Sequence, residues 1–260
     1  MKIAEPKEMN FDDKELREIK ATCGSGCKLL GPNDTFEFTC SRCTRCCKNR
    51  SDYHRFDKMI LVPYDIIRIS RRLKMTTTDF LSQYTDFEAR PLTQSMEIAL
   101  KFKGNEYDNK CPFLEGDQCR IYDDRPMGCR LYPLGRAFEG DKYVIVLPES
   151  HDDCALGTGQ EWIVHDWLDS QDLLHYFKYD RPWHLSHRLD RDKFNKLPPQ
   201  ERDTFFRCLY DIDSIVTFKE KDNKPMSVEE TISTIYMLCE KILKMHGCLK
   251  DSGIADSGGD

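Results

Sequence analysis

Apolar residues recur at helical spacing through most of the C-terminal part of the chain. The clearest stretch is 228–245, where apolar side chains repeat along one face. Ser227 and Glu230 stand at the positions of a capping box, which begins a helix by satisfying its first N–H groups. Apolar and aromatic residues from Trp162 onward also fit amphipathic helices. The sequence therefore predicts that residues 158–250 are mainly helical.

The preceding part of the chain mixes strand and helix patterns. Pro63 is expected to open a helix, since proline fits the first helical position. A second helix is expected to start near Thr77 or Thr78 as its N-cap. Short apolar or alternating runs predict strands at 60–62, 98–102 and 143–147.

These patterns predict an α+β or mainly α fold, with an irregular cysteine-rich metal-binding core and a helical C-terminal segment. Residues 1–39 are polar and are expected to form an N-terminal arm with loops rather than a core element. The expected cysteine-cluster metal-binding domain covers 40–157, and the helical region covers 158–250. The Ser- and Gly-containing stretch 251–260 is expected to be a disordered tail.

Composition narrows the class of protein. The 260 residues are 39% hydrophobic and 32% charged, which allows a core for one to two domains. A net charge of -6 argues against general nucleic-acid binding, which needs basic surface to neutralise phosphates. No apolar run approaches the roughly 20 residues needed to cross a bilayer, and residues 1–20 lack an apolar leader. We therefore expect a cytoplasmic protein, without direct membrane insertion, whose thiols stay reduced.

The 13 cysteines carry the main chemical signal. Dense thiols serve as disulfides or as ligands for soft metals. The length of the chain, its lack of a leader and its odd cysteine count favour metal over a disulfide scaffold. The first group is Cys40-x2-Cys43-x2-Cys46-Cys47, and the second consists of Cys111, Cys119, Cys129 and Cys154.

The spacing favours an iron–sulfur site over zinc. Thiols at two-residue gaps can converge on one centre, as in ferredoxins, where a remote cysteine completes the cluster. Cys46 and Cys47 are adjacent, so their side chains are expected to diverge toward different sites. Gaps of seven, nine and 24 residues in the second group differ from the paired knuckles of structural zinc. The expected cofactor is one or two 4Fe-4S clusters, with zinc as the alternative.

Prolines and arginines surround these thiols. Pro112, Pro126 and Pro133 interrupt the second group, which is expected to be neither a regular helix nor a central strand. Arginines near both groups either compensate thiolate charge, form a docking face for an acidic partner, or belong to ordinary solvated surface. They are Arg42, Arg45, Arg50, Arg55, Arg120, Arg125, Arg130 and Arg136, accompanied by Lys48.

The combined motifs resemble a known family. The chain is similar to the bacterial and archaeal cysteine-cluster proteins described as zinc- or iron-chelating. The motifs that carry this similarity are the first cysteine run, Cys111-Pro-Phe-Leu, a nearby cysteine and Arg125-Pro-x2-Cys-Arg-x-Tyr-Pro. The resemblance covers roughly residues 40–154. It implies metal ligands at Cys40, Cys43, Cys46, Cys47, Cys111, Cys119 and Cys129, with Cys154 as an eighth.

A more distant resemblance is to the flagellin lysine methylases, which share the cysteine signature. It implies an S-adenosylmethionine-dependent enzyme. The chain, however, has no Gly-rich strand–loop–helix for such a cofactor and lacks the radical-type Cys-x3-Cys-x2-Cys run. No Ser-His-Asp or Cys-His catalytic arrangement stands out either. An enzyme is therefore the less favoured interpretation.

The leading hypothesis is an iron–sulfur protein that acts as a redox- or oxygen-responsive protein-binding regulator of a larger enzyme complex. Its expected partner is another protein or enzyme complex rather than nucleic acid. The alternatives are an electron-transfer or accessory iron–sulfur protein, a cluster-dependent protein-lysine methyltransferase and a structural zinc protein. Cys23 and Cys27 are either an extra site, a reactive or oxidisable pair, or two ordinary thiols.

Overall fold

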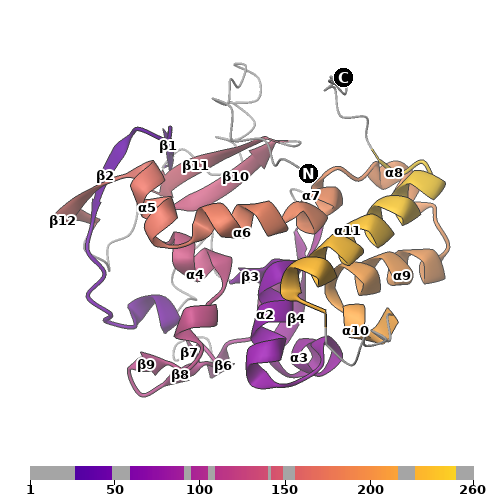
Figure 1. Ribbon diagram of the computed structural model, residues 1–260, viewed down its shortest axis with the longest axis horizontal. Coiled ribbons are helices and arrows are strands. Elements are labelled where there is room, and N and C mark those ends of the chain that lie inside the picture. Colours follow the sequence, from indigo (N-terminus) through magenta and orange to yellow (C-terminus); the bar gives the residue numbers. More distant parts are fainter. Residues whose placement is uncertain are drawn as a thin grey trace.

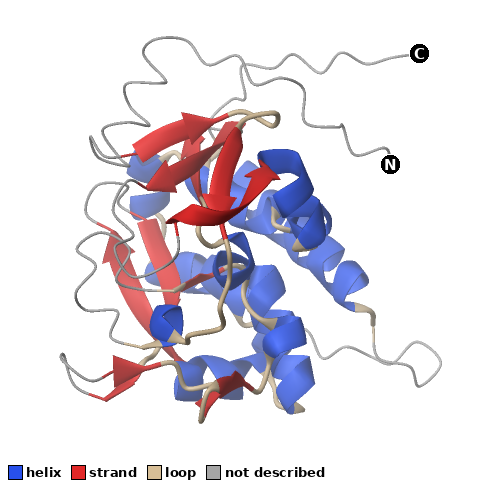
Figure 2. Ribbon diagram, turned by 90° about the vertical axis from the view of Figure 1, so that its left-hand side faces the viewer, coloured by secondary structure: helices blue, strands red, loops and turns tan. Residues whose placement is uncertain are grey.

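The computed structural model describes residues 27–48, 59–90, 95–104, 109–139, 142–148, 156–215 and 226–249. Its strands form small antiparallel sheets, and its helices pack beside them (Figure 1). In Figure 2 the strands lie mainly along the upper and left sides, with most helices to the right. The fold is α+β with a helical C-terminal segment, which confirms the predicted class.

The larger sheets bring together strands that are distant in sequence. Their orders are β1-β11-β10, β3-β5-β4 and β12-β2, and two small hairpins pair β6 with β7 and β8 with β9. The strands are β1 (Cys27–Leu30), β2 (Thr35–Phe38), β3 (Ile60–Leu61), β4 (Thr85–Arg90), β5 (Ser95–Leu100), β6 (Lys103–Gly104), β7 (Asn109–Lys110), β8 (Leu114–Glu115), β9 (Gln118–Cys119), β10 (Gly135–Glu139), β11 (Lys142–Pro148) and β12 (Leu156–Ile163).

The helices gather mainly after the cysteine motifs. Two short 3-10 helices, η1 (Arg45–Cys47) and η3 (Tyr122–Asp124), lie within those motifs. The α-helices are α2 (Pro63–Leu73), α3 (Thr77–Tyr84), α4 (Met127–Leu131), α5 (Val164–Ser170), α6 (Leu173–Tyr179), α7 (Arg181–His187), α8 (Arg191–Asn195), α9 (Pro199–Tyr210), α10 (Ile212–Ile215) and α11 (Val228–Met245). Two predicted helix starts are confirmed. Helix α2 begins at Pro63, and α11 begins directly after Ser227, the first residue of the capping box.

The loop prediction for the N-terminal arm is wrong where the structure describes that segment. Strand β1 pairs with β11, and β2 pairs with β12. Leu30, Phe36 and Phe38 are buried in the core. The sequence did not predict these strands, because each has only four residues, which is too few to show a clear alternation of apolar and polar positions.

Local boundaries also differ from the sequence predictions. Helix α3 has Thr76 as its N-cap, because the Thr76 side chain accepts a hydrogen bond from the Asp79 N–H. Trp162 and Ile163 end strand β12 instead of beginning a helix. The proline-rich second cysteine group does contain a helix, the five-residue α4, which begins directly after Pro126. Pro126 thus caps the start of a short helix instead of preventing one.

One hydrophobic cluster spans the described chain. Phe113, Ile121 and Met127 from the second cysteine group pack in the same cluster as Tyr176 and Leu243 from the C-terminal helices. Helix α4 contacts α6, and η3 contacts α2. The cysteine-bearing loops therefore rest on the helical region. Within the described residues, no helix is long and apolar enough to cross a membrane.

The capping box of α11 gives a direct test of what stabilises the start of this helix. Ser227→Ala removes the hydroxyl that accepts from the Glu230 N–H, and is expected to lower the free energy of unfolding by about 1 kcal/mol. Urea unfolding followed by circular dichroism measures the change. The matched control is Ser233→Ala on the exposed part of the same helix, which should leave stability nearly unchanged. Equal losses in both variants would contradict a specific capping role.

Candidate metal centre

The first cysteine group occupies a tightly turned loop. Arg42 and Thr44 both adopt left-handed backbone conformations, with φ of 53° and 61°, on either side of Cys43. Helix η1 follows directly, so the backbone changes direction several times within a few residues. Cys40, Cys43 and Cys46 are exposed, and Cys47 is half-buried. The turns needed to gather closely spaced thiols are therefore present.

Cys46 and Cys47 point closer together than their adjacency suggests. Their Sγ atoms lie 3.9 Å apart. Two thiolates bound to one tetrahedral zinc ion at about 2.3 Å each would be about 3.8 Å apart. The distance allows both thiols to share one metal ion, so the geometry does not require the two separate centres that adjacency led us to expect.

The second group is built on short hairpins and turns. The β8–β9 hairpin closes with Gly116, whose φ of 59° suits the left-handed position of a two-residue turn. This hairpin carries Cys119 on β9, just after Cys111. Both thiols are half-buried, as is that of Cys129 on α4. Figure 1 shows these hairpins at the lower left of the molecule, below α4.

The backbone joins the two cysteine groups directly. The Cys111 N–H donates to the Cys47 carbonyl at 2.8 Å. Lys48 and Lys110 form an antiparallel β-bridge beside that bond. A ligand cysteine predicted in one group is therefore held next to one predicted in the other.

Electrostatics also links the groups. Burial raises the pKa of the Cys119 thiol, and the nearby charge of Cys46 adds to that shift. A hydrogen bond from the Ile121 N–H and the charges of Arg125 and Arg120 act in the opposite direction. Cys119 thus sits among groups that can stabilise a thiolate once a metal offsets the cost of burial.

Cys129 lies on the other side of the loop, against Met59. Its Sγ is 3.9 Å from the Met59 Sδ. A Cβ added at the preceding Gly128 would come within 2.7 Å of the same sulfur, so Met59 packs tightly on the start of α4. Cys154 and Cys23 lie outside the described residues, and Cys27 lies on β1.

The predicted ligands fit a metal in chemistry but are only partly gathered. Thiols are the donors that zinc and iron–sulfur clusters take. Yet in the described ranges no group of three Cys, His, Asp or Glu side chains is close enough to hold a metal ion. The structure thus brings the Cys46 and Cys47 sulfurs together, joins the backbone of Cys111 to that of Cys47, and places Cys119 within reach of the charge of Cys46.

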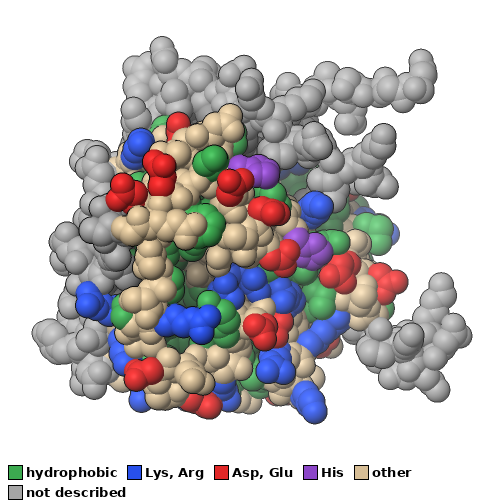
Figure 3. Space-filling model, turned by 60° about the vertical axis from the view of Figure 1, so that its left-hand side comes forward, with side chains coloured by type: hydrophobic (Ala, Val, Ile, Leu, Met, Phe, Trp, Pro, Cys, Tyr) green, Lys and Arg blue, Asp and Glu red, His purple; other side chains and the backbone are tan. Residues whose placement is uncertain are grey.

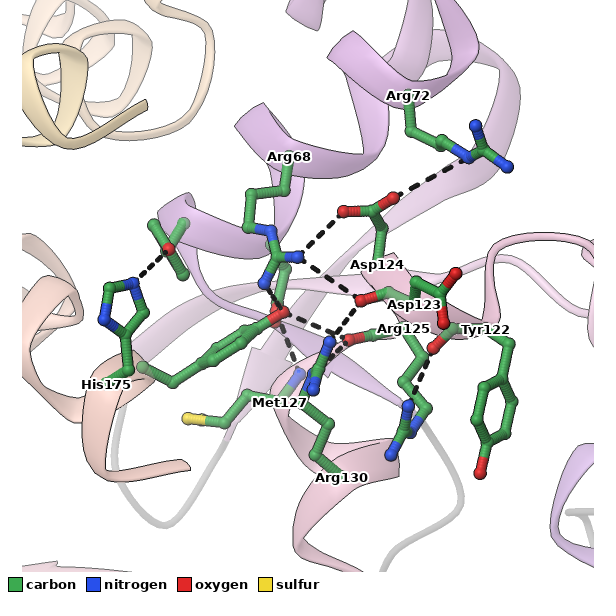
Figure 4. Close-up of polar contacts among 12 residues, drawn as sticks. Arg68, Arg72, Tyr122, Asp123, Asp124, Arg125, Met127, Arg130 and His175 are labelled. Carbon is green, nitrogen blue, oxygen red and sulfur yellow. Dashed lines mark hydrogen bonds and ion pairs between the residues drawn. The ribbon is translucent and has the colours of Figure 1, made fainter. Parts of the chain in front are cut away.

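An arginine–tyrosine cluster fixes the segment between Cys119 and Cys129 (Figure 4). The guanidinium carbons of Arg68 and Arg130 lie 4.9 and 4.7 Å from the centre of the Tyr176 ring. Arg68 donates to the Tyr176 hydroxyl, which donates weakly to the Arg125 carbonyl at 3.5 Å. Burial raises the pKa of Tyr176 to about 12, so the hydroxyl remains protonated.

These arginines hold the backbone of residues 122–125 by its carbonyl groups. Arg130 donates to the carbonyls of Arg125 and Asp123, and also to that of Gln171 at 3.1 Å. Arg68 adds bonds to the Asp123 carbonyl and, at 2.8 Å, to the Asp124 carboxylate. We call Arg68, Arg130 and Tyr176 the loop clamp. It attaches the loop before α4 to helices α2 and α6.

Asp65 anchors the same region through N–H groups. One of its carboxylate oxygens accepts from the Met127 N–H at 2.9 Å and the other from the Val62 N–H at 3.1 Å. The side chain is fully buried, and burial raises the pKa of Asp65 to about 7, against the two hydrogen bonds. A single carboxyl therefore joins the start of α2 to the start of α4.

Sequence reasoning missed the loop clamp and Asp65. Asp65 stands at the N3 position after Pro63, which is a recognisable helix-start signal. Tyr176 had no signal, since an aromatic residue in an amphipathic helix is normally core. Arg136, by contrast, is buried in an ion pair with Asp180 and does not form part of the clamp.

The region that carries both cysteine groups is similar to a known family of metal-chelating domains. Residues 39–149 match the family model "CxxCxxCC: Putative zinc- or iron-chelating domain". The match confirms the resemblance found in the motifs. No curated protein and no solved structure matches the chain.

The loop clamp should control metal affinity. Arg130→Lys keeps the charge but loses the planar group that bonds three carbonyls, so the loop holding Cys119 and Cys129 should loosen. Zinc affinity, measured by competition with a chromophoric chelator, is expected to fall by about tenfold to hundredfold. Arg207→Lys, in an exposed pair on α9, is the control and should bind zinc normally. Unchanged affinity in Arg130→Lys would exclude this role.

Asp65 should make stability depend on pH. Its folded pKa of about 7 exceeds the ordinary value of about 3.9, so its contribution to the free energy of unfolding is largest below about pH 4 and is lost as pH rises through 7. Between these two pH values the contribution of Asp65 to the free energy of unfolding falls by up to about 1.4 kcal/mol per pH unit. Asp65→Asn should remove this dependence on pH.

Urea unfolding of both proteins across this pH range, with reductant present, measures the difference. Asp203→Asn, at an exposed carboxylate on α9, is the control and should give a curve parallel to that of the unaltered chain. A parallel curve for Asp65→Asn would contradict the raised pKa.

Proposed function

We propose that the chain binds an iron–sulfur cluster through thiols of both cysteine groups and uses the state of that cluster to regulate docking to another protein. The observation that carries the proposal is the hydrogen bond between the Cys111 N–H and the Cys47 carbonyl, which holds the two groups together. The proposed ligands are Cys40, Cys43, Cys46, Cys47, Cys111, Cys119 and Cys129, with Cys154 as the eighth.

The two groups differ in how firmly they are held. Cys119 and Cys129 flank a segment that the loop clamp fixes to α2 and α6. Cys40 and Cys43, by contrast, are exposed on the first loop. The second group would thus act as the fixed half of the site, onto which the first loop closes when metal binds. Metal affinity would then contribute to the order of that loop.

The donor set suits an iron–sulfur cluster as well as zinc. All proposed ligands are thiols, and the charges of Arg125 and Arg120 oppose the burial that raises the pKa of Cys119. A cluster held here would supply a centre that changes charge on reduction and is lost on reaction with oxygen. Loss of the cluster would release the first loop, so the surface beside it would change. That physical change is the proposed signal to the partner.

Structural zinc is the second candidate. The 3.9 Å between the Cys46 and Cys47 sulfurs suits two ligands of a single tetrahedral ion. Zinc would hold the same loops together without a redox response. The two candidates differ in metal, sulfide and colour, so one measurement separates them.

Metal analysis of protein purified without oxygen tests the proposal. Iron and acid-labile sulfide in equal amounts, with visible absorption, are expected, and zinc without sulfide would replace the cluster with the structural alternative. Cys119→Ser is expected to lose most of the metal, because it removes a half-buried ligand. Cys208→Ala, at a buried thiol on α9, is the control and should retain it.

Docking is tested by affinity capture from an extract of the source cell, with the cluster intact, oxidised or removed. The captured proteins should depend on the state of the cluster. Capture of the same proteins with the same affinity in all three states would contradict regulated docking, while the metal result would stand.

A further inference from the structure

An exposed aromatic residue of the second cysteine group is contacted by arginines from both groups. Tyr122 on η3 is 43% exposed. The guanidinium carbon of Arg42 lies 5.3 Å from the centre of its ring, and that of Arg125 lies 4.1 Å away. We call Arg42, Tyr122 and Arg125 the basic platform.

Both arginines remain available to a ligand. In the described part of the chain, neither Arg42 nor Arg125 forms an ion pair with a carboxylate. Arg125 uses part of its guanidinium to bond the Tyr122 carbonyl and the Gln171 side chain, both at 2.8 Å. Stacking on tyrosine orders a guanidinium while leaving outward N–H groups, which suit carboxylates.

The chain as a whole carries a net charge of -6. Figure 3 turns the left-hand side of Figure 1 forward and shows Lys and Arg side chains across the middle of this face, with Asp and Glu side chains also present on it. Nearby Asp124 is already paired with Arg68 and Arg72, and Asp123 beside Tyr122 is exposed. The two arginines of the platform outnumber this one carboxylate, so the platform is positively charged on a chain of net negative charge and would draw an acidic partner.

The platform depends on the cysteine groups being together. Arg42 lies between Cys40 and Cys43, whereas Tyr122 and Arg125 lie between Cys119 and Cys129. Arg42 reaches Tyr122 where the Cys111–Cys47 hydrogen bond holds the first loop against the second group. A metal bound by both groups would add to that hold and keep Arg42 on the ring.

We propose that the basic platform binds an acidic peptide segment of the partner protein, and does so only while metal joins the two cysteine groups. This inference rests on the proposed function and identifies its docking surface. A carboxylate-rich peptide fits better than nucleic acid, because a few arginines in a chain of net negative charge neutralise too few phosphates for stable binding.

The test uses fluorescence anisotropy with the full chain and three labelled probes. These are a glutamate-rich peptide, the same peptide with every Glu replaced by Gln, and a single-stranded oligothymidylate of similar length. The metal-loaded chain should bind the glutamate peptide most tightly, and the affinity should fall as salt is raised. Tighter binding of the oligothymidylate would overturn the assignment of an acidic peptide.

Variants locate the surface. Arg42→Ala, compared with the unaltered chain at equal metal content, should weaken binding of the glutamate peptide by about fivefold, the effect of losing one exposed charge pair. Lys28→Ala removes one exposed positive charge from β1 and is the control, which should bind normally. If both substitutions weaken peptide binding equally, the peptide binds through the positive charge of the chain in general and not at the platform, and the proposal is overturned.

Metal removal tests the dependence on the cysteine groups. Chelator-treated protein should bind the glutamate peptide about as weakly as metal-loaded Arg42→Ala, and Arg42→Ala should have no further effect once metal is removed. Unchanged binding after metal removal would overturn the coupling.

The outcomes separate the two proposals. A chain that holds its metal but does not bind the peptide refutes the platform and leaves the metal function intact. If the chain holds no metal yet binds the peptide through Arg42, the proposed metal function is refuted and the basic platform stands as a peptide-binding surface.

Discussion

Guanidinium groups bonded to backbone carbonyls determine how the cysteine-bearing loops are presented. Arg68 and Arg130 hold the carbonyls of residues 123 and 125, with Tyr176 between them and helices α2 and α6 behind. A loop of this kind would otherwise leave its carbonyl groups to water, and it would move freely. The clamp replaces water with planar donors that have a fixed direction. The loop therefore takes its shape from the helices on which it rests.

The structure divides the described cysteines of the two groups into a partly buried set and an exposed set. Cys111, Cys119 and Cys129 are half-buried, while three thiols of the first group are exposed to solvent. Burial raises the pKa of the Cys119 thiol, so a metal bound there would offset the cost of its charged form.

Sequence patterns predicted the long elements well and the short ones poorly. Helix α11 has both a capping box and a long apolar face, and the prediction matches it from Val228 to Met245. Strands β1 and β2 have four residues each, too few to establish a period, so a loop was expected there. Their existence depends on pairing with β11 and β12, which are more than 100 positions away in sequence.

The motif made the thiols easy to find, but not their surroundings. Cysteine spacing predicted the two groups, and the family match over 39–149 agrees. The clamp depends on Arg68 of α2 and Tyr176 of α6, which lie apart in the chain and carry no shared motif. A side chain that acts by bonding a distant carbonyl leaves no local pattern. Contacts of this kind become visible only after the chain has folded.

The matched stretch is thus not the unit that folds. Strand β1, before residue 39, pairs with β11 inside the stretch, and the hydrophobic core continues into α11 near the C-terminus. A fragment cut at 39 and 149 would leave one edge of β11 unpaired and expose the apolar side of α4. Such a fragment would aggregate through that open edge before its cysteines could be assayed. The stretch that carries the metal-binding motif and the part of the chain that packs into one core therefore have different boundaries.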